Sequence, residues 1–169
     1  MTQGHRSLDV HIRAAEAADA SDITDLYGQR HAYEGTLQLP FPSRRTWTER
    51  LANQAENIHY LVAVSESRLL GQLTLATHTR PRRKHVAELG MGVCSSSLRR
   101  GVGSALLQAA LAMCDQWLNI VRVELDVYTD NSAALALYKK HGFVIEGEHR
   151  KSAFRDGHFV DVFSMARVQ

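Results

Sequence analysis

The chain has little of what stabilises small secreted, metal-dependent or membrane-embedded folds. Its 169 residues include two cysteines, Cys94 and Cys114, which are too far apart for a disulfide framework or for the closely spaced ligand pairs of a zinc site. No stretch approaches the ~20 consecutive apolar residues of a membrane-spanning helix. Residues 1–9 are polar and lack the apolar segment of a secretion signal. We therefore expect a flexible segment 1–9, a reducing cytoplasmic location, no metal and no membrane partner.

An excess of one charge is also lacking. The formal net charge of +2 does not by itself indicate a nucleic-acid partner, and we expect none. The densest basic run, residues 80–84, has no interleaved aromatic side chains, so a solvated loop is a simpler interpretation than a nucleic-acid surface. In an enzyme, the run can instead place an arginine, with Arg82 as the candidate, beside a substrate carboxylate or a cofactor phosphate.

Hydrophobic periodicity predicts one α/β domain over residues 10–169. The predicted strands are residues 10–13, 60–64, 69–77, 85–93, 121–127, 144–154 and 159–167, with a hairpin turn at 156–157. The predicted helices are residues 17–29, 44–52 with Ser43 as the N-cap, 102–118 and 132–141. The third helix has the clearest apolar face, formed by Leu106, Leu107, Ala110, Leu111, Cys114, Trp117 and Leu118. This order predicts a mixed sheet with helices on both faces.

The most informative segment leads from a strand end through a basic turn into the third helix. Gly101 and Gly103 leave backbone amides unshielded in this turn, and the free N–H groups and dipole of a helix N-terminus attract an anion. No Gly-Lys-Ser/Thr follows the glycines, and a third glycine and a ribose-binding acid are missing, which argues against nucleoside triphosphates and dinucleotides. We expect a pyrophosphate bound without metal.

The turn resembles the cofactor loop of the GCN5-related N-acetyltransferase (GNAT) family, Gln/Arg-x-x-Gly-x-Gly/Ala. Residues 101–103 (Gly-Val-Gly) match, whereas Leu98 departs from the usual Gln or Arg. A second block, residues 130–143, resembles the family signature Asn-x-x-Ala-x-x-Leu-Tyr-x-x-x-Gly-Phe. The resemblance implies a mostly antiparallel sheet of about seven strands, with helices on both faces. It also implies a splay between the fourth and fifth strands that admits the pantetheine arm of acetyl-CoA.

The resemblance also implies which residues contact acetyl-CoA. The backbone of Met91 and Val93 would meet the pantetheine. Asn131 matches the family's cofactor-contacting asparagine, although an asparagine before a helix is also an ordinary N-cap. The residues expected around the pyrophosphate are Arg99, Arg100, Gly101, Val102, Gly103 and Ser104.

Acetyl transfer from a thioester to an amine needs a neutral amine and a proton for the departing thiolate. Tyr138 matches the family tyrosine near the thioester sulfur and is our candidate for the acid and for cofactor contact; the alternative is a packed aromatic residue. Glu88, within an apolar strand, is the general-base candidate, or else an ordinary ion-paired or solvent-facing residue. Neither cysteine has a recognisable partner for nucleophilic catalysis, so we expect direct attack in a ternary complex.

The acceptor remains open between several amines. The chain resembles the small bacterial GNAT subgroup that acetylates free L-amino acids and phosphinothricin, which favours the α-amine of a Met- or Phe-like amino acid. Leu37, Leu39 and Phe41, in a loop with two prolines, are candidates for apolar walls beside Arg82 and Glu88. Protein N-termini, polyamines and aminoglycosides are alternative acceptors, and a non-catalytic CoA-binding sensor or a nucleic-acid binder is the alternative class. Exposed strand edges favour a homodimer.

Overall fold

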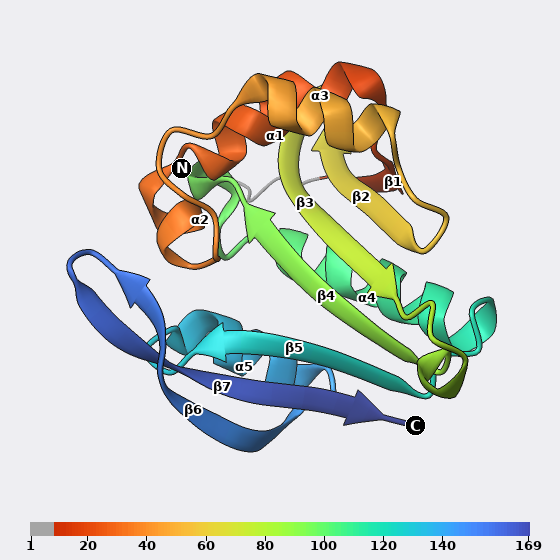
Figure 1. Ribbon diagram of the computed structural model, residues 1–169. Coiled ribbons are helices and arrows are strands. Elements are labelled where there is room, and N and C mark those ends of the chain that lie inside the picture. The colour runs from red at the N-terminus through yellow and green to blue at the C-terminus, as the bar shows by residue number, and fades with distance from the viewer. Residues whose placement is uncertain (1–8) are drawn as a thin grey trace, which may run out of the picture.

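A seven-stranded sheet runs through the protein in the order β1-β2-β3-β4-β5-β7-β6, and this computed structural model describes residues 9–169 (Figure 1). The strands are β1 (His11–Ala14), β2 (Ile58–Ser65), β3 (Arg68–Thr77), β4 (Val86–Val93), β5 (Arg122–Tyr128), β6 (Val144–Arg155) and β7 (His158–Val168). All neighbours are antiparallel except the parallel β4–β5 pair, so the predicted mixed, mostly antiparallel sheet is confirmed. Residues 1–8 lie outside the described residues, and the flexibility expected for 1–9 stays a prediction.

Helices cover the two faces of this sheet unequally (Figure 1). They are α1 (Ala20–Tyr27), α2 (Arg30–Glu34), α3 (Arg44–Ala52), α4 (Val102–Gln116) and α5 (Ser132–Lys140), with short 3-10 helices η1 (Ala17–Asp19), η2 (Pro81–Arg83) and η3 (Ser95–Ser97). On β3, Leu73 and Leu75 pack with the apolar stripe of α4, whereas on β2 Val62 packs with α1 and α3 on the other face. The helices α1 and α3 do not extend over β5–β7, and α2 meets only the turn end of the β6–β7 hairpin, where Arg30 pairs with Asp156 and Arg155 donates to the Glu34 carbonyl. Most of that half of the sheet is therefore covered on one face only (Figure 1).

The helix α4 forms because its apolar residues recur at helical spacing and meet the sheet. Leu106, Leu107 and Ala110 are fully buried, as the periodicity predicts. The prediction was wrong for Trp117, whose side chain is 82% exposed. The helix ends at Gln116, and Trp117 leaves helical geometry at φ −127°, so its side chain no longer follows the buried stripe.

Three local predictions need correction. Residues 17–29 were predicted as one helix, but they form the 3-10 helix η1 followed by α1, and α1 ends at Tyr27 with Gly28 as its C-cap. The short helix α2 occupies Arg30–Glu34, so its last two residues overlap the loop 33–42 that the two prolines led us to expect as extended. Ser43 stands at the N-cap position of α3, but its side chain makes no capping hydrogen bond.

The parallel pair β4–β5 separates soon after it starts. Val86–Glu88 pair with Arg122–Glu124, and beyond Glu88 the two strands have no further register partners. Figure 1 shows β4 and β5 diverging from this point. The predicted splay between the fourth and fifth strands is therefore confirmed, and it leaves one edge of β4 unpaired from Leu89 to Val93. None of the helices in residues 9–169 is long and apolar enough to cross a membrane.

Candidate active site

A cavity of about 820 Å³ lies against the splay, at the border between the part of the sheet that α1–α3 cover and the part that they leave open. The sheet supplies a floor that includes Thr74, Glu88, Gly90, Met91, Arg122, Glu124, Asp126, Glu146 and Ser164. Helices and the loop after α2 supply walls that include Tyr27, Thr36, Leu37, Gln38, Trp47, Arg50 and Tyr138. The strand β4 and the helix α5 thus bring two predicted catalytic residues, Glu88 and Tyr138, into one cavity.

The glycine turn stands at the splayed end of β4. Gly101 has φ +82° and caps α4, a conformation that costs glycine nothing but strains other residues. The first bond into the helix runs from the Ala105 N–H to the Gly101 carbonyl at 2.9 Å, so the amides of residues 102–104 precede the hydrogen-bonded ladder. A Cβ on Gly103 would lie 3.2 Å from Leu137 Cδ2 and 3.7 Å from Met91 Sδ, so the first turn of α4 packs tightly against the opened strand.

The unpaired edge of β4 presents backbone groups to the splay. The Cys94 N–H bonds to Leu70 on the β3 side, and because backbone direction alternates along a strand, Met91 and Val93 face the other way, toward the splay. His31 in α2 donates from Nε2 to the Val93 carbonyl at 2.7 Å. Sequence reasoning missed His31, since nothing local marks a histidine that bonds a strand 62 residues away.

Tyr138 is buried in the cavity wall and is 7% exposed. Its ring packs against Phe143 at a centroid distance of 5.7 Å. Burial raises the pKa of Tyr138 to about 12, because a phenolate would lose hydration there. The phenol therefore keeps its proton across the neutral range and can donate a hydrogen bond to charge that develops beside it.

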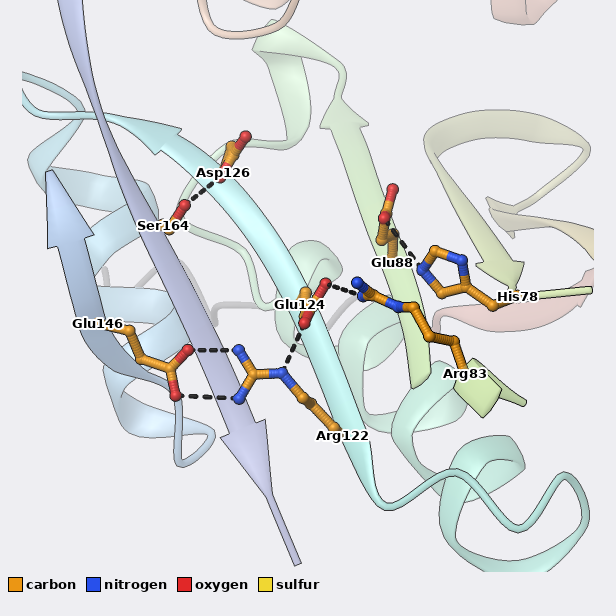
Figure 2. A network of polar contacts seen from close by, with 8 residues as sticks. All are labelled: His78, Arg83, Glu88, Arg122, Glu124, Asp126, Glu146 and Ser164. Atoms are coloured by element: carbon orange, nitrogen blue, oxygen red, sulfur yellow. Dashed lines mark hydrogen bonds and ion pairs between the residues drawn. The ribbon is translucent and has the colours of Figure 1, made fainter. Parts of the chain in front are cut away.

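Glu88 belongs to a network of charged groups on the cavity floor (Figure 2). Glu124 accepts hydrogen bonds from Arg122 at 2.5 Å and from Arg83 at 2.9 Å, and Arg122 also binds Glu146. Burial opposes ionisation of Glu124, but the hydrogen bonds and charges of both arginines outweigh it and hold its pKa below the ordinary value.

Glu88 differs from Glu124 in having no arginine against it in the part of the chain that the structure describes. Its nearest ionisable neighbour among those residues is His78, with Nε2 3.2 Å from Glu88 Oε1, and the Glu88 side chain is 59% exposed (Figure 2). The ligand atoms of His78, Glu88 and Glu124 lie within 4.8 Å of one another and could hold a cation. Arg83 and Arg122 already neutralise Glu124, however, so the network does not need a bound cation to balance that charge. The absence of a metal stays a prediction.

A buried polar chain, which sequence reasoning also missed, connects α1 to the cavity. The Tyr27 hydroxyl donates to Gln72 Oε1 at 2.6 Å, and Gln72 Nε2 donates to Thr74 Oγ1 at 2.9 Å. Gln72 is fully buried, so both bonds replace hydration that its amide loses. Because Thr74 Oγ1 accepts from Gln72, the hydroxyl proton of Thr74 is free to be donated toward the cavity.

The other predicted site residues are spread over the main cavity, the hollows beside it, η2 and the glycine turn. Leu37 lines the main cavity, Leu39 and Phe41 line smaller hollows beside it, and all three side chains are largely exposed. Arg82 is exposed on η2 and does not line the main cavity, whereas its neighbour Arg83 reaches Glu124. Arg99 and Arg100 precede α4 in the glycine turn, and the Ser104 hydroxyl lies 2.7 Å from His141 Nε2.

Asn131 begins α5 next to the cavity wall. Its Oδ1 accepts a hydrogen bond from the Ala134 amide at 3.2 Å, so the N-cap interpretation of this residue is confirmed. Its side-chain nitrogen lies 3.6 Å from the position of a Cβ on Gly35, which places the residue beside the loop after α2. A role in cofactor contact remains a prediction.

A mixed sheet that opens at its parallel pair, with a glycine turn and a helix N-terminus at the opened edge, is the architecture expected of the acyl-CoA N-acetyltransferases. Comparison with known proteins agrees. The model of the acetyltransferase (GNAT) family matches residues 23–143, and the chain belongs to this family. The protein is an acetyl-CoA-dependent N-acetyltransferase of the GNAT type.

Three relatives extend over nearly the whole chain. The L-amino acid N-acetyltransferase AaaT of Escherichia coli K12 is 45% identical over 161 residues, which are 95% of this chain and 99% of the relative. The phosphinothricin N-acetyltransferase of Alcaligenes faecalis is 29% identical over 92% of this chain and 81% of its own. The crystal structure of a phosphinothricin acetyltransferase from Sinorhizobium meliloti in complex with acetyl-CoA has a TM-score of 0.84 at 23% identity, covering 94% of this chain and 88% of that one. The predicted family and subgroup are confirmed.

Proposed function

We propose that the protein acetylates the α-amine of a free L-amino acid with an apolar or sulfur-containing side chain, or of a close analogue. The observation that carries this proposal is one cavity that contains a protonated phenol, Tyr138, and the carboxylate of Glu88, which has no arginine partner among residues 9–169. The exposed Leu37 at its rim offers an apolar wall, and Leu39 and Phe41 extend that wall along the loop. The E. coli relative, named an L-amino acid N-acetyltransferase, supports the same acceptor class.

The residues around the splay fit acetyl-CoA. On the open edge of β4, the backbone of Met91 and the N–H of Val93 can bond the amides of the pantetheine arm as a further strand would, whereas the Val93 carbonyl already accepts from His31. The open space at Gly101 and the free amides at the start of α4 suit a pyrophosphate. In this proposal the pyrophosphate contacts come from Arg99, Arg100, Gly101, Val102, Gly103 and Ser104, with Asn131 and Tyr138 closer to the thioester.

The chemistry assigned to these residues is direct transfer. Glu88, itself or through one water, takes a proton from the ammonium group of the acceptor, and the neutral amine then attacks the thioester carbonyl. A C–N bond forms, the C–S bond breaks, and the departing sulfur takes the proton of the Tyr138 hydroxyl. The acceptor nitrogen loses its second proton as the amide forms, and that proton, carried by water, restores the Tyr138 phenol. A pKa near 12 makes Tyr138 a stable donor, since it stays protonated until the thiolate appears.

Thiol release from acetyl-CoA across amino acids, polyamines, aminoglycosides and short peptides tests this proposal. Release with methionine- or phenylalanine-like acceptors is the expected result. Tyr138→Phe should lower kcat about 100-fold with little change in the affinity for acetyl-CoA, since it removes one proton donor. Glu88→Gln should lower kcat at neutral pH, whereas Glu148→Gln on the exposed face of β6 is the matched control. Binding of acetyl-CoA without release on any amine would instead indicate a sensor.

One observation favours polyamines as the second candidate acceptor. The lining includes four carboxylates, Glu88, Glu124, Asp126 and Glu146, against two arginines, and such a floor attracts cations. Spermidine in the same panel decides between the two classes of acceptor.

We also propose that the protein is a cytoplasmic homodimer. Both cysteines are free, which fits a reducing compartment, and Phe154 and Phe159 form an exposed apolar pair on the β6–β7 hairpin that a second copy could cover. Sedimentation of the purified protein tests the oligomeric state.

A further inference from the structure

The two arginines that line the main cavity differ in their partners. Arg122 is held by Glu124 and Glu146, so its charge is already neutralised (Figure 2). Arg50, in contrast, has no carboxylate within ion-pair distance among residues 9–169. Arg83, which approaches the floor from η2, is also occupied, by Glu124. Arg50 is therefore the lining cation that is left with unused hydrogen-bond donors.

Aromatic packing holds Arg50 in place. The guanidinium carbon lies 4.9 Å from the centre of the Trp47 ring, on the same helix, α3. Trp47 is buried, stacks on Tyr27 at 5.4 Å and meets the edge of Tyr60 at 6.0 Å. Contact with the ring occupies the face of the guanidinium, whereas the N–H groups around its edge stay available for a bidentate partner. Because the ring already restricts the Arg50 side chain, less conformational entropy is lost when a ligand binds it.

Arg50 also shares its cavity with the groups assigned to the reaction. Its guanidinium lies over Trp47, Trp47 stacks on Tyr27, and Tyr27 lines the main cavity together with Tyr138. Thr74, whose hydroxyl proton is free, lines the same cavity, and Arg50 further borders the hollow beneath Leu37 and Leu39. A ligand with its anionic group at Arg50 would therefore occupy the cavity that Tyr138 and Leu37 also line.

We propose that Arg50 binds the α-carboxylate of the acceptor and is the residue that selects amino acids over amines without a carboxylate. This inference rests on the proposed function, because it assigns the carboxylate of that acceptor. A guanidinium and a carboxylate form charge-assisted paired hydrogen bonds, which Lys or Gln cannot reproduce. The same positive charge disfavours polyamines at this end of the cavity, in spite of the acidic floor. Arg82, the candidate from the sequence, becomes the rival for the carboxylate.

The test compares acceptors that differ only in the carboxylate: L-phenylalanine with phenethylamine, and L-methionine with 3-(methylthio)propylamine. Steady-state kinetics are measured for the wild type, Arg50→Gln, Arg50→Lys and Arg82→Gln. Arg45→Gln, on the exposed side of the same helix and paired with Glu49, is the matched control. Arg50→Gln should raise the KM for the amino acids roughly 10- to 100-fold and leave the KM for the two amines nearly unchanged. Arg50→Lys should fall between wild type and Arg50→Gln.

The outcomes separate the two levels of the proposal. A wild type that is silent on amino acids overturns both the proposed function and this inference. A wild type that is active on amino acids, with an unchanged amino acid-to-amine ratio in Arg50→Gln, overturns the inference alone. If the preference for amino acids over the matched amines is lost in Arg82→Gln and kept in Arg50→Gln, the carboxylate binds the basic run, and the inference on Arg50 is overturned. Thermal unfolding of each variant is recorded, and Arg50→Lys, which keeps the charge over Trp47, serves if Arg50→Gln does not fold.

Discussion

The strands β3 and β6 are of similar length but lie in different surroundings. On β3, Leu73 and Leu75 are buried under α4, and Gln72 on the opposite face is buried under α1, so the strand is enclosed on both sides. On β6, nearly every side chain from Val144 to Arg155 is exposed or half-exposed. The comparison extends to the whole sheet: β2–β4 carry helices on both faces, whereas β5–β7 carry them on one (Figure 1).

This difference explains where the site lies. Where α1–α3 end, the sheet changes from an apolar interior to a charged surface, and the largest of the cavities described here spans that border. The helices over the enclosed half contribute the buried Trp47, and α5, behind the open half, contributes the buried Tyr138. The strands that border the splay contribute exposed carboxylates, Glu88 from β4 and Asp126 from β5. An amine acceptor needs both kinds of surroundings, because its proton must leave toward water while the acetyl transfer proceeds beside buried groups.

The largest expected difference between the two halves is the energy of truncating a side chain. Leu73→Ala should lower the free energy of unfolding by about 3 kcal/mol, because it leaves a cavity in a region packed on both sides. Ile145→Ala on β6 should cost about 1 kcal/mol or less, because its side chain is already in contact with water. Urea denaturation of both variants measures the contrast, and equal losses would mean that β6 is covered in solution, for instance by a second copy.

The next effect concerns ion pairs. Asp19 accepts hydrogen bonds from Arg13 at 2.7 and 2.9 Å and from the Glu16 amide at 2.7 Å, and the Arg13 bond is the main cause of its lowered pKa. Asp19→Asn should lower the free energy of unfolding at pH 7 by about 1–2 kcal/mol.

Because the folded-state pKa of Asp19 is lowered, its contribution is present above the pKa of an unfolded aspartate, near 4, and is lost as the pH falls through the folded value. The stabilities of wild type and Asp19→Asn should therefore converge in acid. Glu146→Gln, at the exposed pair with Arg122, is the counterpart in the open half and should have a smaller effect, since water and salt screen that pair. A larger effect of Glu146→Gln would contradict the comparison.

The smallest expected effect on stability concerns two glycines, Gly101 in the turn before α4 and Gly147 on β6. Gly101→Ala should lower the free energy of unfolding by about 1 kcal/mol, because φ is +82° there and alanine is strained in that region. Gly147→Ala on β6 is the control: its φ is not in the left-handed region, and an added Cβ meets nothing within 4 Å. Thermal unfolding of the two variants measures the difference, and a loss in Gly147→Ala of the same size would show that β6 is packed.

Most strands and helices could be predicted because local patterns determine them. The helix α4 and the hairpin turn at residues 156–157 follow from apolar periodicity and from an Asp-Gly pair, whose φ values of 52° and 83° suit a tight turn. The helix α2 was missed because its five residues are too few to show a period, and its His31 is anchored to β4. Trp117 was misplaced because periodicity does not tell where a helix ends.

The candidate site could be predicted only in part. Tyr138, Glu88 and the glycine turn stand in sequence motifs or in positions that are unusual for their residue type. Arg50 gives no such signal, since an arginine on an exposed helix is ordinary until the fold places it over Trp47 and beside the cavity. The pairing of Arg122 with Glu124 and Glu146 likewise gives no sequence signal, because it joins β5 to β6, and β7 lies between these two strands in the sheet.

The sequence by itself determined most of the helices and strands, the glycine turn at the start of α4 and the family, because each depends on residues that are neighbours along the chain or at a fixed spacing. The tertiary structure alone decided which charges are neutralised and which remain free. That choice depends on side chains from η2, α3, β4, β5 and β6 meeting across the sheet, and the distances between them are set by the splay and by how far α1–α3 extend.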